Sequence, residues 1–148
     1  MIERRRIVTA KVKQPYHAAE PLAFPKAEAL IRECRKTSVG MAMEAIRPMI
    51  AAHAPACAAV LVGRSLTLPP LESILKSHAM IHTAEGVFYR EILIEACGQL
   101  GLKVERVPEK PLAADLGKVN GLGRTLGPPW TQDHKLATLG ALAALKIR

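Results

Sequence analysis

One apolar run sets the strongest limit on how this chain can fold. From Ala56 to Gly63 the sequence reads Ala-Cys-Ala-Ala-Val-Leu-Val-Gly, directly after Pro55. A run this short and continuous is typical of a β-strand that is buried on both faces, as in parallel sheets covered by helices. We therefore expect a central strand here, in a mostly parallel sheet.

Two further segments predict strands. Arg4–Val12 mixes β-branched residues with charges in rough alternation, which is typical of a strand with one face in solvent. Leu102–Val107 alternates apolar with charged residues and predicts a strand nearer the edge of the sheet. Gly101 precedes it as a stop signal for a helix.

Helical patterns occupy most of the remaining chain. Pro25 can open one helix, Thr37 or Ser38 can cap the next, and Pro48 is expected to kink that second helix. The predicted helices cover Lys26–Arg35, Val39–His53, Ala84–Leu100 and Trp130–Lys146, with a short helical pattern in Leu66–Lys76. Pro108–Pro129 holds four prolines and four glycines without periodicity, which predicts a long surface loop.

This order of elements favours an α/β fold. We expect three layers, with a mostly parallel sheet covered by helices and right-handed crossovers. The length of 148 residues is close to that of one ordinary domain, and no internal repeat is visible, so residues 1–148 are expected to form a single domain. Only 3% of the residues are aromatic, so the core must consist mostly of Ala, Leu, Ile and Val.

The cysteines and apolar runs indicate a compartment. Cys34, Cys57 and Cys97 are odd in number and widely spaced, which favours buried, reduced thiols over a disulfide framework or a metal motif. A reactive thiol is the alternative. The N-terminus lacks the apolar segment of a signal peptide, and no apolar run is long enough to span a bilayer. We therefore expect a soluble cytoplasmic protein with no membrane partner.

The net charge narrows the class of partner. The chain carries 21 Lys and Arg against 13 Asp and Glu, a formal charge of +8. Such an excess attracts polyanions, and DNA or RNA is the natural partner class. The basic residues are dispersed along the sequence, however, and many basic cytoplasmic proteins bind no nucleic acid.

The segment from Ser77 to Arg90 carries the most suggestive chemistry. His78 and His82 stand four residues apart, and Glu85 follows at the expected start of a helix. The histidines could bind a metal or act as acid and base, with Glu85 as third ligand or partner. The spacing differs from that of two-histidine metalloproteases and of cytidine deaminases. Polar loop histidines and a helix-capping Thr83 are the plainer interpretation.

Several other positions could contact a ligand. Arg64 directly follows the apolar run, and Asp133 lies in the first turn of the last predicted helix with Lys135 beside it. The carboxyl end of a central strand and the start of a neighbouring helix often face the ligand crevice of parallel sheets. Lys118 and Arg124 lie in a glycine-rich stretch that lacks the pattern of a phosphate loop, but could touch a nucleic-acid backbone.

With those positions fixed, the chain from about Thr37 to its end resembles the ribonuclease H-like superfamily, especially Holliday-junction resolvases and their relatives. The likeness covers about three-quarters of the chain. Its matching elements are an initial helix, the strand end Val60–Gly63, the helix opening Ala84–Arg90, the strand Leu102–Val107 and a last helix that opens with Asp133.

The resemblance implies a chemistry. Those nucleases cut phosphodiesters with two divalent ions, Mg²⁺ or Mn²⁺, held by carboxylates on the first strand, the central strand and the last helix. Asp133 matches the last position, whereas Arg4–Val12 contains no acid and Gly63-Arg64 stands at the central one. Glu72 or Glu85 would have to fill the gap. The resemblance thus implies either a metal-dependent phosphodiester hydrolase with a rearranged site or a relative that binds without cutting.

In this interpretation Glu85 and Asp133 hold the metal and, with His82, form the catalytic set. The residues expected to bind DNA or RNA are Arg64, His78, Arg90, Lys118, Arg124 and Lys135.

Two alternatives stay open. His78 and His82 could be the acid and base of an enzyme acting on a small anionic metabolite, which Arg64 would clamp in a closed pocket. The alanine-rich segment Leu136–Leu145 could instead pack on its twin, which would make the chain a self-associating homodimer without catalysis.

Overall fold

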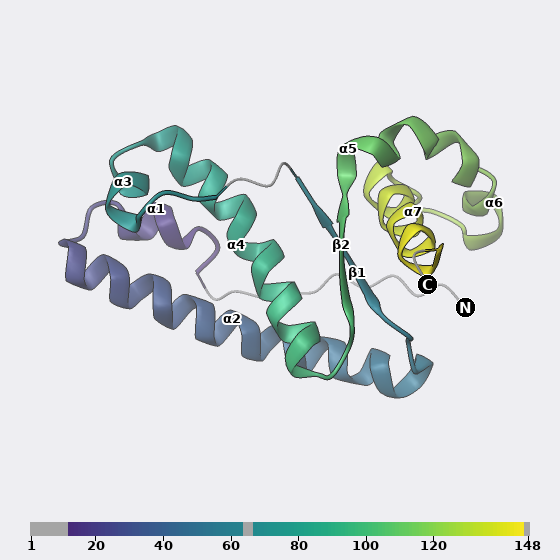
Figure 1. The fold of residues 1–148 in the computed structure, drawn as a ribbon, viewed down its shortest axis with the longest axis horizontal. Coiled ribbons are helices and arrows are strands. Elements are labelled where there is room, and N and C mark those ends of the chain that lie inside the picture. The colour runs from purple at the N-terminus through teal and green to yellow at the C-terminus, as the bar shows by residue number, and fades with distance from the viewer. Residues whose placement is uncertain (1–11, 64–66, 147–148) are drawn as a thin grey trace. The chain divides into compact units, whose positions relative to one another are not determined.

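The computed structural model describes residues 12–63 and 67–146, which form two compact units (Figure 1). The helical unit comprises residues 12–54 and 67–100, and the sheet unit comprises residues 55–63 and 101–146. Arg64 and the predicted strand at Arg4–Val12, apart from Val12 itself, lie outside the described residues. The division into two units does not test our expectation of a single domain over residues 1–148, which stays a prediction.

The expected three-layer α/β fold of ribonuclease H-like type is wrong. Helices hold about 70% of the described residues, and the strands among them form one two-stranded parallel sheet. Its strands are β1 (Ala58–Val62) and β2 (Val104–Pro108), with Ala58 opposite Val104 and Val62 opposite Pro108. The protein is therefore dominated by helices.

The apolar run does form a strand, but one with less cover than we expected. Val60 is the buried residue of β1, and its neighbours on both sides are only half-buried. The alanine-rich sequence of β1 is apolar enough to resemble a core strand. Alanine side chains are small, however, so they bury little apolar surface when neighbouring elements cover the strand only in part. An apolar run thus identified the strand without identifying its surroundings.

The sheet unit surrounds these two strands with short helices and one longer helix. The predicted loop Pro108–Pro129 is wrong, because this stretch forms three short helical turns. They are α5 (Glu109–Leu112), the 3₁₀ helix η1 (Ala113–Val119) and α6 (Leu122–Leu126). Trp130 contacts two of them, η1 and α6. Its Nε1 donates to the carbonyl of Val119 at 3.2 Å, and its ring lies so close to Gly123 that a Cβ there would be 2.6 Å from Trp130 Cδ1.

The last helix, α7 (Gln132–Lys146), confirms the predicted terminal helix. Leu136 and Leu139 are buried, and α7 packs on both strands, on α5 and on η1. Leu142 and Leu145, which continue the same row of leucines, are 45% and 55% exposed. A spacing of three falls short of a full turn, so the row drifts around the helix and away from the core.

In the helical unit, α2 (Phe24–His53) is one helix where two were predicted. Thr37 and Ser38 do not cap a second helix: the Thr37 hydroxyl donates to Glu33 Oε1 at 3.3 Å, and Ser38 is buried within the helix. Ala27 and Ala42 are fully buried, and α2 packs against α4 (His78–Gln99) and α1 (Pro15–Ala19). Packing therefore outweighs the local capping preference.

The helix α4 (His78–Gln99) confirms the predicted middle helix but begins earlier. Ser77 is its N-cap, accepting a hydrogen bond from Met80 N at 3.4 Å, and Thr83 lies inside the helix with its hydroxyl on the carbonyl of Ala79. The two histidines predicted on a loop are therefore helical. Two short helices, α1 (Pro15–Ala19) and α3 (Leu71–Leu75), complete the unit and contact α4.

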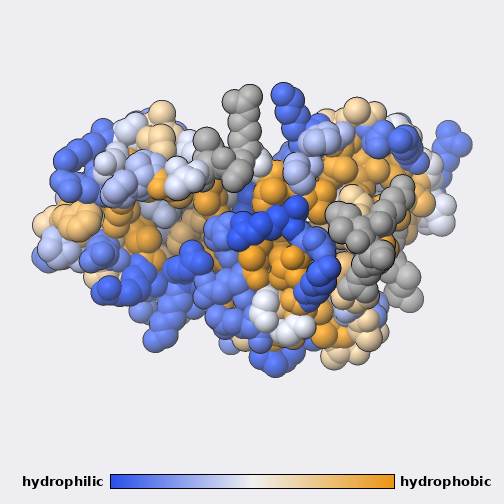
Figure 2. All heavy atoms as spheres, viewed as in Figure 1, coloured by the Kyte–Doolittle hydropathy of each residue, from blue (hydrophilic) through white to orange (hydrophobic). Residues whose placement is uncertain are grey.

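The visible face over the first half of α2 is largely hydrophilic (Figure 2). The exposed charged residues of this half of the helix, on all its sides, are Lys26, Glu28, Arg32, Glu33, Arg35 and Lys36. Among the described residues, none of the helices combines the length and apolar character that a bilayer crossing needs. Cys34 and Cys97 are buried free thiols, as expected, whereas Cys57 is half-buried.

Candidate metal centre

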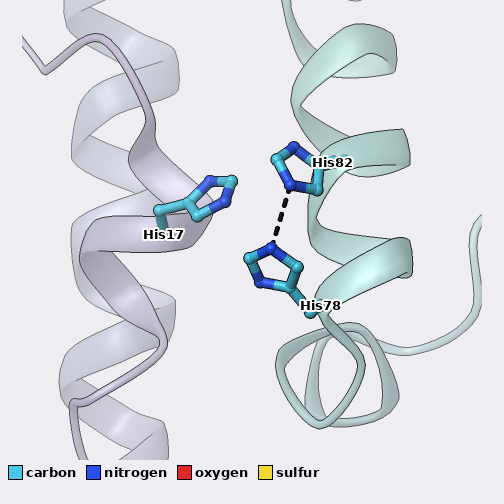
Figure 3. A group of neighbouring side chains, drawn as sticks. All are labelled: His17, His78 and His82. Atoms are coloured by element: carbon cyan, nitrogen blue, oxygen red, sulfur yellow. Dashed lines mark hydrogen bonds between the residues drawn. The ribbon is translucent and has the colours of Figure 1, made fainter.

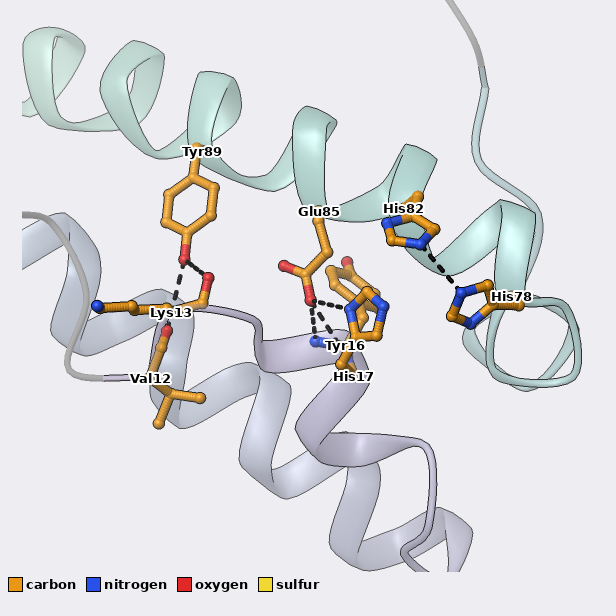
Figure 4. A network of polar contacts seen from close by, with 8 residues as sticks. All are labelled: Val12, Lys13, Tyr16, His17, His78, His82, Glu85 and Tyr89. Atoms are coloured by element: carbon orange, nitrogen blue, oxygen red, sulfur yellow. Dashed lines mark hydrogen bonds and ion pairs between the residues drawn. The ribbon is translucent and has the colours of Figure 1, made fainter.

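One face of α4 carries a row of polar side chains that meets the segment at residues 12–17. His78, His82, Glu85 and Tyr89 are separated by four, three and four positions, so they follow one stripe along the helix. Each contacts that segment or a neighbour in the row (Figure 4). We call these four residues the polar stripe of α4.

Glu85 caps the short helix α1 from outside. Its Oε1 atom accepts hydrogen bonds from the backbone N–H of Tyr16 at 2.8 Å and of His17 at 3.2 Å. These are free amides of the first turn of α1, and Gln14 at the N-cap gives no side-chain bond. Glu85 is only 8% exposed, and among the described residues its Oε2 atom is buried without a hydrogen-bond partner.

Two tyrosines hold the same segment on α4. The ring of Tyr16 packs edge-to-face on Phe88 with centroids 5.9 Å apart, and the hydroxyl of Tyr89 donates to the carbonyls of Val12 and Lys13. Burial, followed by the nearby charge of Glu85, raises the pKa of both tyrosines. Both phenols therefore stay protonated and able to donate at neutral pH.

Three imidazoles converge at the start of the stripe. His78 Nε2 and His82 Nε2 lie 3.1 Å apart. The ring centroid of His17 lies 5.5 Å from that of His78 and 4.7 Å from that of His82 (Figure 3). One ring nitrogen from each residue falls within 4.8 Å of the other two. His78 and His82 are exposed and His17 is partly buried, so the cluster is open to solvent.

A carboxylate stands behind this cluster. His17 Nδ1 lies 3.4 Å from Glu85 Oε1, the same oxygen that caps α1. With Nδ1 turned toward Glu85, Nε2 is the ring nitrogen left for a ligand on the side of His78 and His82 (Figure 4). Many metal sites in proteins have this order, in which a carboxylate binds one nitrogen of an imidazole and the other nitrogen binds the ion.

The spacing of the nitrogens suits a tetrahedral ion. Two nitrogens bound to Zn²⁺ at about 2.0–2.1 Å and at a tetrahedral angle lie about 3.3 Å apart. His78 Nε2 and His82 Nε2 already stand near this spacing, 3.1 Å apart, in a hydrogen bond that an ion bound to both rings would replace. The distance to the His17 nitrogen, which lies within 4.8 Å of the other two, exceeds this spacing by about one or two ångströms. Rotation of the exposed His78 and His82 side chains can close that gap while His17 keeps its contact with Glu85.

The residues predicted from sequence divide between the two units. His78, His82, Glu85 and Arg90 all lie on α4 in the helical unit, whereas Asp133 is on α7 in the sheet unit. The sheet unit also holds the remaining predicted contacts for nucleic acid that the structure describes, which are Lys118, Arg124 and Lys135. Shared metal binding by Glu85 and Asp133 stays a prediction.

Glu72, the other acid offered for the gap in the metal site, has a partner of its own. Glu72, on α3, pairs with Lys76 at 2.8 Å, and the Lys76 ammonium bound to it lowers the pKa of this carboxyl. In the sheet unit Asp115 pairs with Lys118 at 2.7 Å. These acids therefore form ordinary surface ion pairs.

A small cavity lies where we expected a ligand crevice in the sheet unit. It measures about 240 Å³ and adjoins the carboxyl ends of both strands and the first turns of α7. Its walls are Val62, Gly63, Pro108, Glu109, Lys110, Ala113, Gln132 and Leu136. Asp133 and Lys135 are not among them, so the two predicted residues of α7 lie outside this cavity.

His17 was missed from the sequence. It stands 61 positions before His78, in a stretch between Val12 and Pro25 for which the sequence predicted neither a helix nor a strand. No spacing rule connects residues so far apart, and only the packing of α1 on α4 joins them. The pair His78 and His82, by contrast, is visible as an interval of four.

Comparison of the chain with family models, with curated proteins and with solved structures finds no match. The resemblance to the ribonuclease H-like superfamily thus gains no support from relatives.

Proposed function

We propose that this protein binds one divalent transition-metal ion, of the Zn²⁺ class, through His17, His78 and His82, and uses the bound water in a hydrolytic reaction. The observation that carries the proposal is the convergence of three imidazole nitrogens within 4.8 Å of one another. Two of these side chains come from successive turns of α4 and the third from α1.

The ligand type selects the ion. Imidazole nitrogens suit Zn²⁺, Cu²⁺, Ni²⁺ and Fe²⁺, whereas Mg²⁺ and Mn²⁺ favour carboxylate, carbonyl and water oxygens. Among the residues that the structure describes, the carboxylate that contacts the cluster is Glu85, and it already accepts from two backbone amides through Oε1. We therefore propose a transition metal at the histidines in place of the Mg²⁺ or Mn²⁺ expected at Glu85 and Asp133.

The number of ligands favours chemistry over a purely structural role. Structural zinc sites are closed by four protein ligands, whereas three histidines leave a fourth position for water. A bound Zn²⁺ lowers the pKa of that water to about 7, which supplies hydroxide at neutral pH. His78 and His82 are exposed, so a substrate can reach the open position.

Metal binding tests the proposal directly. Chelator-treated protein should bind one Zn²⁺ per chain in a calorimetric titration, and Co²⁺ should give the visible absorption of a tetrahedral site. His82→Ala should weaken both signals at least tenfold, whereas His53→Ala, a matched change at the end of α2 and outside the cluster, should not. Equal zinc binding by His82→Ala would place the ion elsewhere and contradict the proposal.

Hydrolysis needs its own assay. Zinc-loaded protein should cleave an activated ester such as p-nitrophenyl acetate, or the phosphodiester bis-p-nitrophenyl phosphate, at a rate that a chelator and His82→Ala both abolish. Cleavage of the phosphodiester would select the substrate class implied by the family resemblance. A zinc-loaded protein that cleaves neither substrate faster than free zinc would argue against catalysis.

Binding to nucleic acid is a second proposal, and the distribution of charge favours it. Residues 12–54 and 67–100 of the helical unit hold eight Lys and Arg and eight Asp and Glu, so the whole excess of +8 comes from the rest of the chain. We propose that this remainder, which includes Lys118, Arg124 and Lys135, contacts DNA or RNA. Affinity for a duplex or a junction should then fall steeply as salt rises, and an affinity indifferent to salt would refute it.

We also propose a cytoplasmic location, which the three free cysteines favour. Fractionation of the cells that express the protein, with blotting of each fraction, tests it. Recovery in an oxidising compartment with paired cysteines would contradict it.

A further inference from the structure

The acid behind the histidines needs an explanation that metal ligation does not give. Glu85 is the only charged residue among the buried side chains that the structure describes, and its exposure is 8%. Burial of a carboxylate is costly unless hydrogen bonds compensate for the lost hydration. Glu85 Oε1 obtains such bonds from α1, since it contacts Tyr16 N, His17 N and His17 Nδ1, whereas Oε2 has no partner among the described residues.

The first two contacts fix the backbone of α1. This helix has five residues, too few to be stable alone, and no side chain of its own caps it. Glu85 supplies from α4 the acceptor that an N-cap residue would normally provide. The position of α1 on α4 therefore depends on this carboxylate, together with the packing of Tyr16 on Phe88.

The third contact fixes the ring of His17. An imidazole that donates from Nδ1 to a carboxylate is held in the tautomer whose Nε2 carries a lone pair. That lone pair is what a metal ion requires, and the charge of the carboxylate strengthens it as a ligand. Glu85 thus acts on both the place and the chemical state of His17, the one histidine of the cluster that lies outside α4.

We infer that Glu85 is the positioning residue of the metal centre, and that it couples the docking of α1 to the binding of the ion. The inference rests on the proposed metal site. Because Glu85 holds His17 through the backbone and through the ring, metal bound at His17, His78 and His82 strengthens the contact between α1 and α4. An α1 that is already docked in turn presents a ready third ligand.

Two variants separate these roles. Glu85→Gln keeps an oxygen that can accept from the amides of Tyr16 and His17 but removes the charge facing His17 Nδ1, whereas Glu85→Ala removes both. Glu95→Gln is the matched control, because Glu95 lies on the same helix and pairs with Arg35 at the surface. Each protein is titrated with Zn²⁺, and hydrogen exchange is followed by NMR with and without the ion.

The expected results differ between the variants. Glu85→Gln should bind Zn²⁺ about 10- to 100-fold more weakly than the native chain, the usual effect of losing such a carboxylate, while the amides of Tyr16 and His17 stay protected within a few fold. Glu85→Ala should lose both the affinity and the protection of these amides. Zn²⁺ should slow their exchange in the native chain and in Glu95→Gln.

The outcomes that contradict the inference are distinct from those that contradict the metal site. If the native chain binds Zn²⁺ and Glu85→Gln binds it equally well, the role of Glu85 is overturned but the metal site is not. Zinc binding that leaves the exchange of the α1 amides unchanged would overturn the coupling. A native chain that does not bind Zn²⁺ at all would overturn the proposed function, whatever Glu85→Ala does to α1.

Discussion

Zinc should stabilise the folded protein, and His17 should account for most of the effect. His78 and His82 lie one turn apart on α4 and stay together in any state that retains this helix, whereas His17 joins them only when α1 is docked. An ion that binds all three therefore favours the packed form over every form in which α1 has separated. His17→Ala removes this preference and leaves the pair on α4 in place.

The size of the effect follows from mass action. An ion present at one hundred times its dissociation constant stabilises the folded state by about 2.7 kcal/mol. For a chain of this length that raises the melting temperature by roughly 5 to 10 °C. If loss of His17 weakens binding one hundredfold, the same zinc concentration contributes only about 0.4 kcal/mol, or roughly 1 °C.

Thermal unfolding followed by circular dichroism, with and without Zn²⁺, measures these shifts. His53→Ala serves as the control, since it also removes one histidine but none from the cluster. The reasoning is refuted if zinc raises the melting temperature of His17→Ala as much as that of the native chain. It is also refuted if Mg²⁺ produces the same rise, because imidazole ligands discriminate against that ion.

Two further predictions concern packing and thiol chemistry. Gly123→Ala should destabilise the sheet unit by about 1–3 kcal/mol, because the added Cβ would lie 2.6 Å from Trp130 Cδ1. The fluorescence of Trp130, the only tryptophan, reports the unfolding. A variant as stable as the native chain would contradict the close approach of this ring to Gly123. Burial raises the pKa of the Cys34 and Cys97 thiols, so iodoacetamide should modify half-buried Cys57 first. Cys34 and Cys97 should react measurably only at more alkaline pH or after unfolding, which mass spectrometry of the peptides can show. Equal rates of modification of the three thiols at pH 8 would contradict this prediction.

What the sequence predicted well was local. The periodicity of Ala84–Leu100 identified α4, and the interval between His78 and His82 put two ligands of the candidate site beside each other. The start of α4 was misplaced because Thr83 and Ser77 are both suitable caps, and the choice between them depends on packing along Ile81 and the rest of the helix. Local patterns name the elements better than they bound them.

The predictions from sequence failed where tertiary packing decides the structure. The apolar run Ala56–Gly63 predicts a strand, but no pattern in it states how many strands will surround it, so a two-stranded sheet was taken for a larger one. Thr37 and Ser38 predict a helix end that the burial of Ser38 overrides. His17 carries no local signal at all, because its role exists only after α1 has packed on α4.

The intervals along the polar stripe of α4 have a consequence for finding relatives of this chain. Each added residue turns a helix by about 100°, so one insertion between His82 and Glu85 would send the histidines and the carboxylate to different sides. A homologue that keeps the site must therefore preserve the gaps of four, three and four even where most other residues have diverged. The pattern His-x₃-His-x₂-Glu-x₃-Tyr, preceded at any distance by a Tyr-His pair, is a usable query for genome searches.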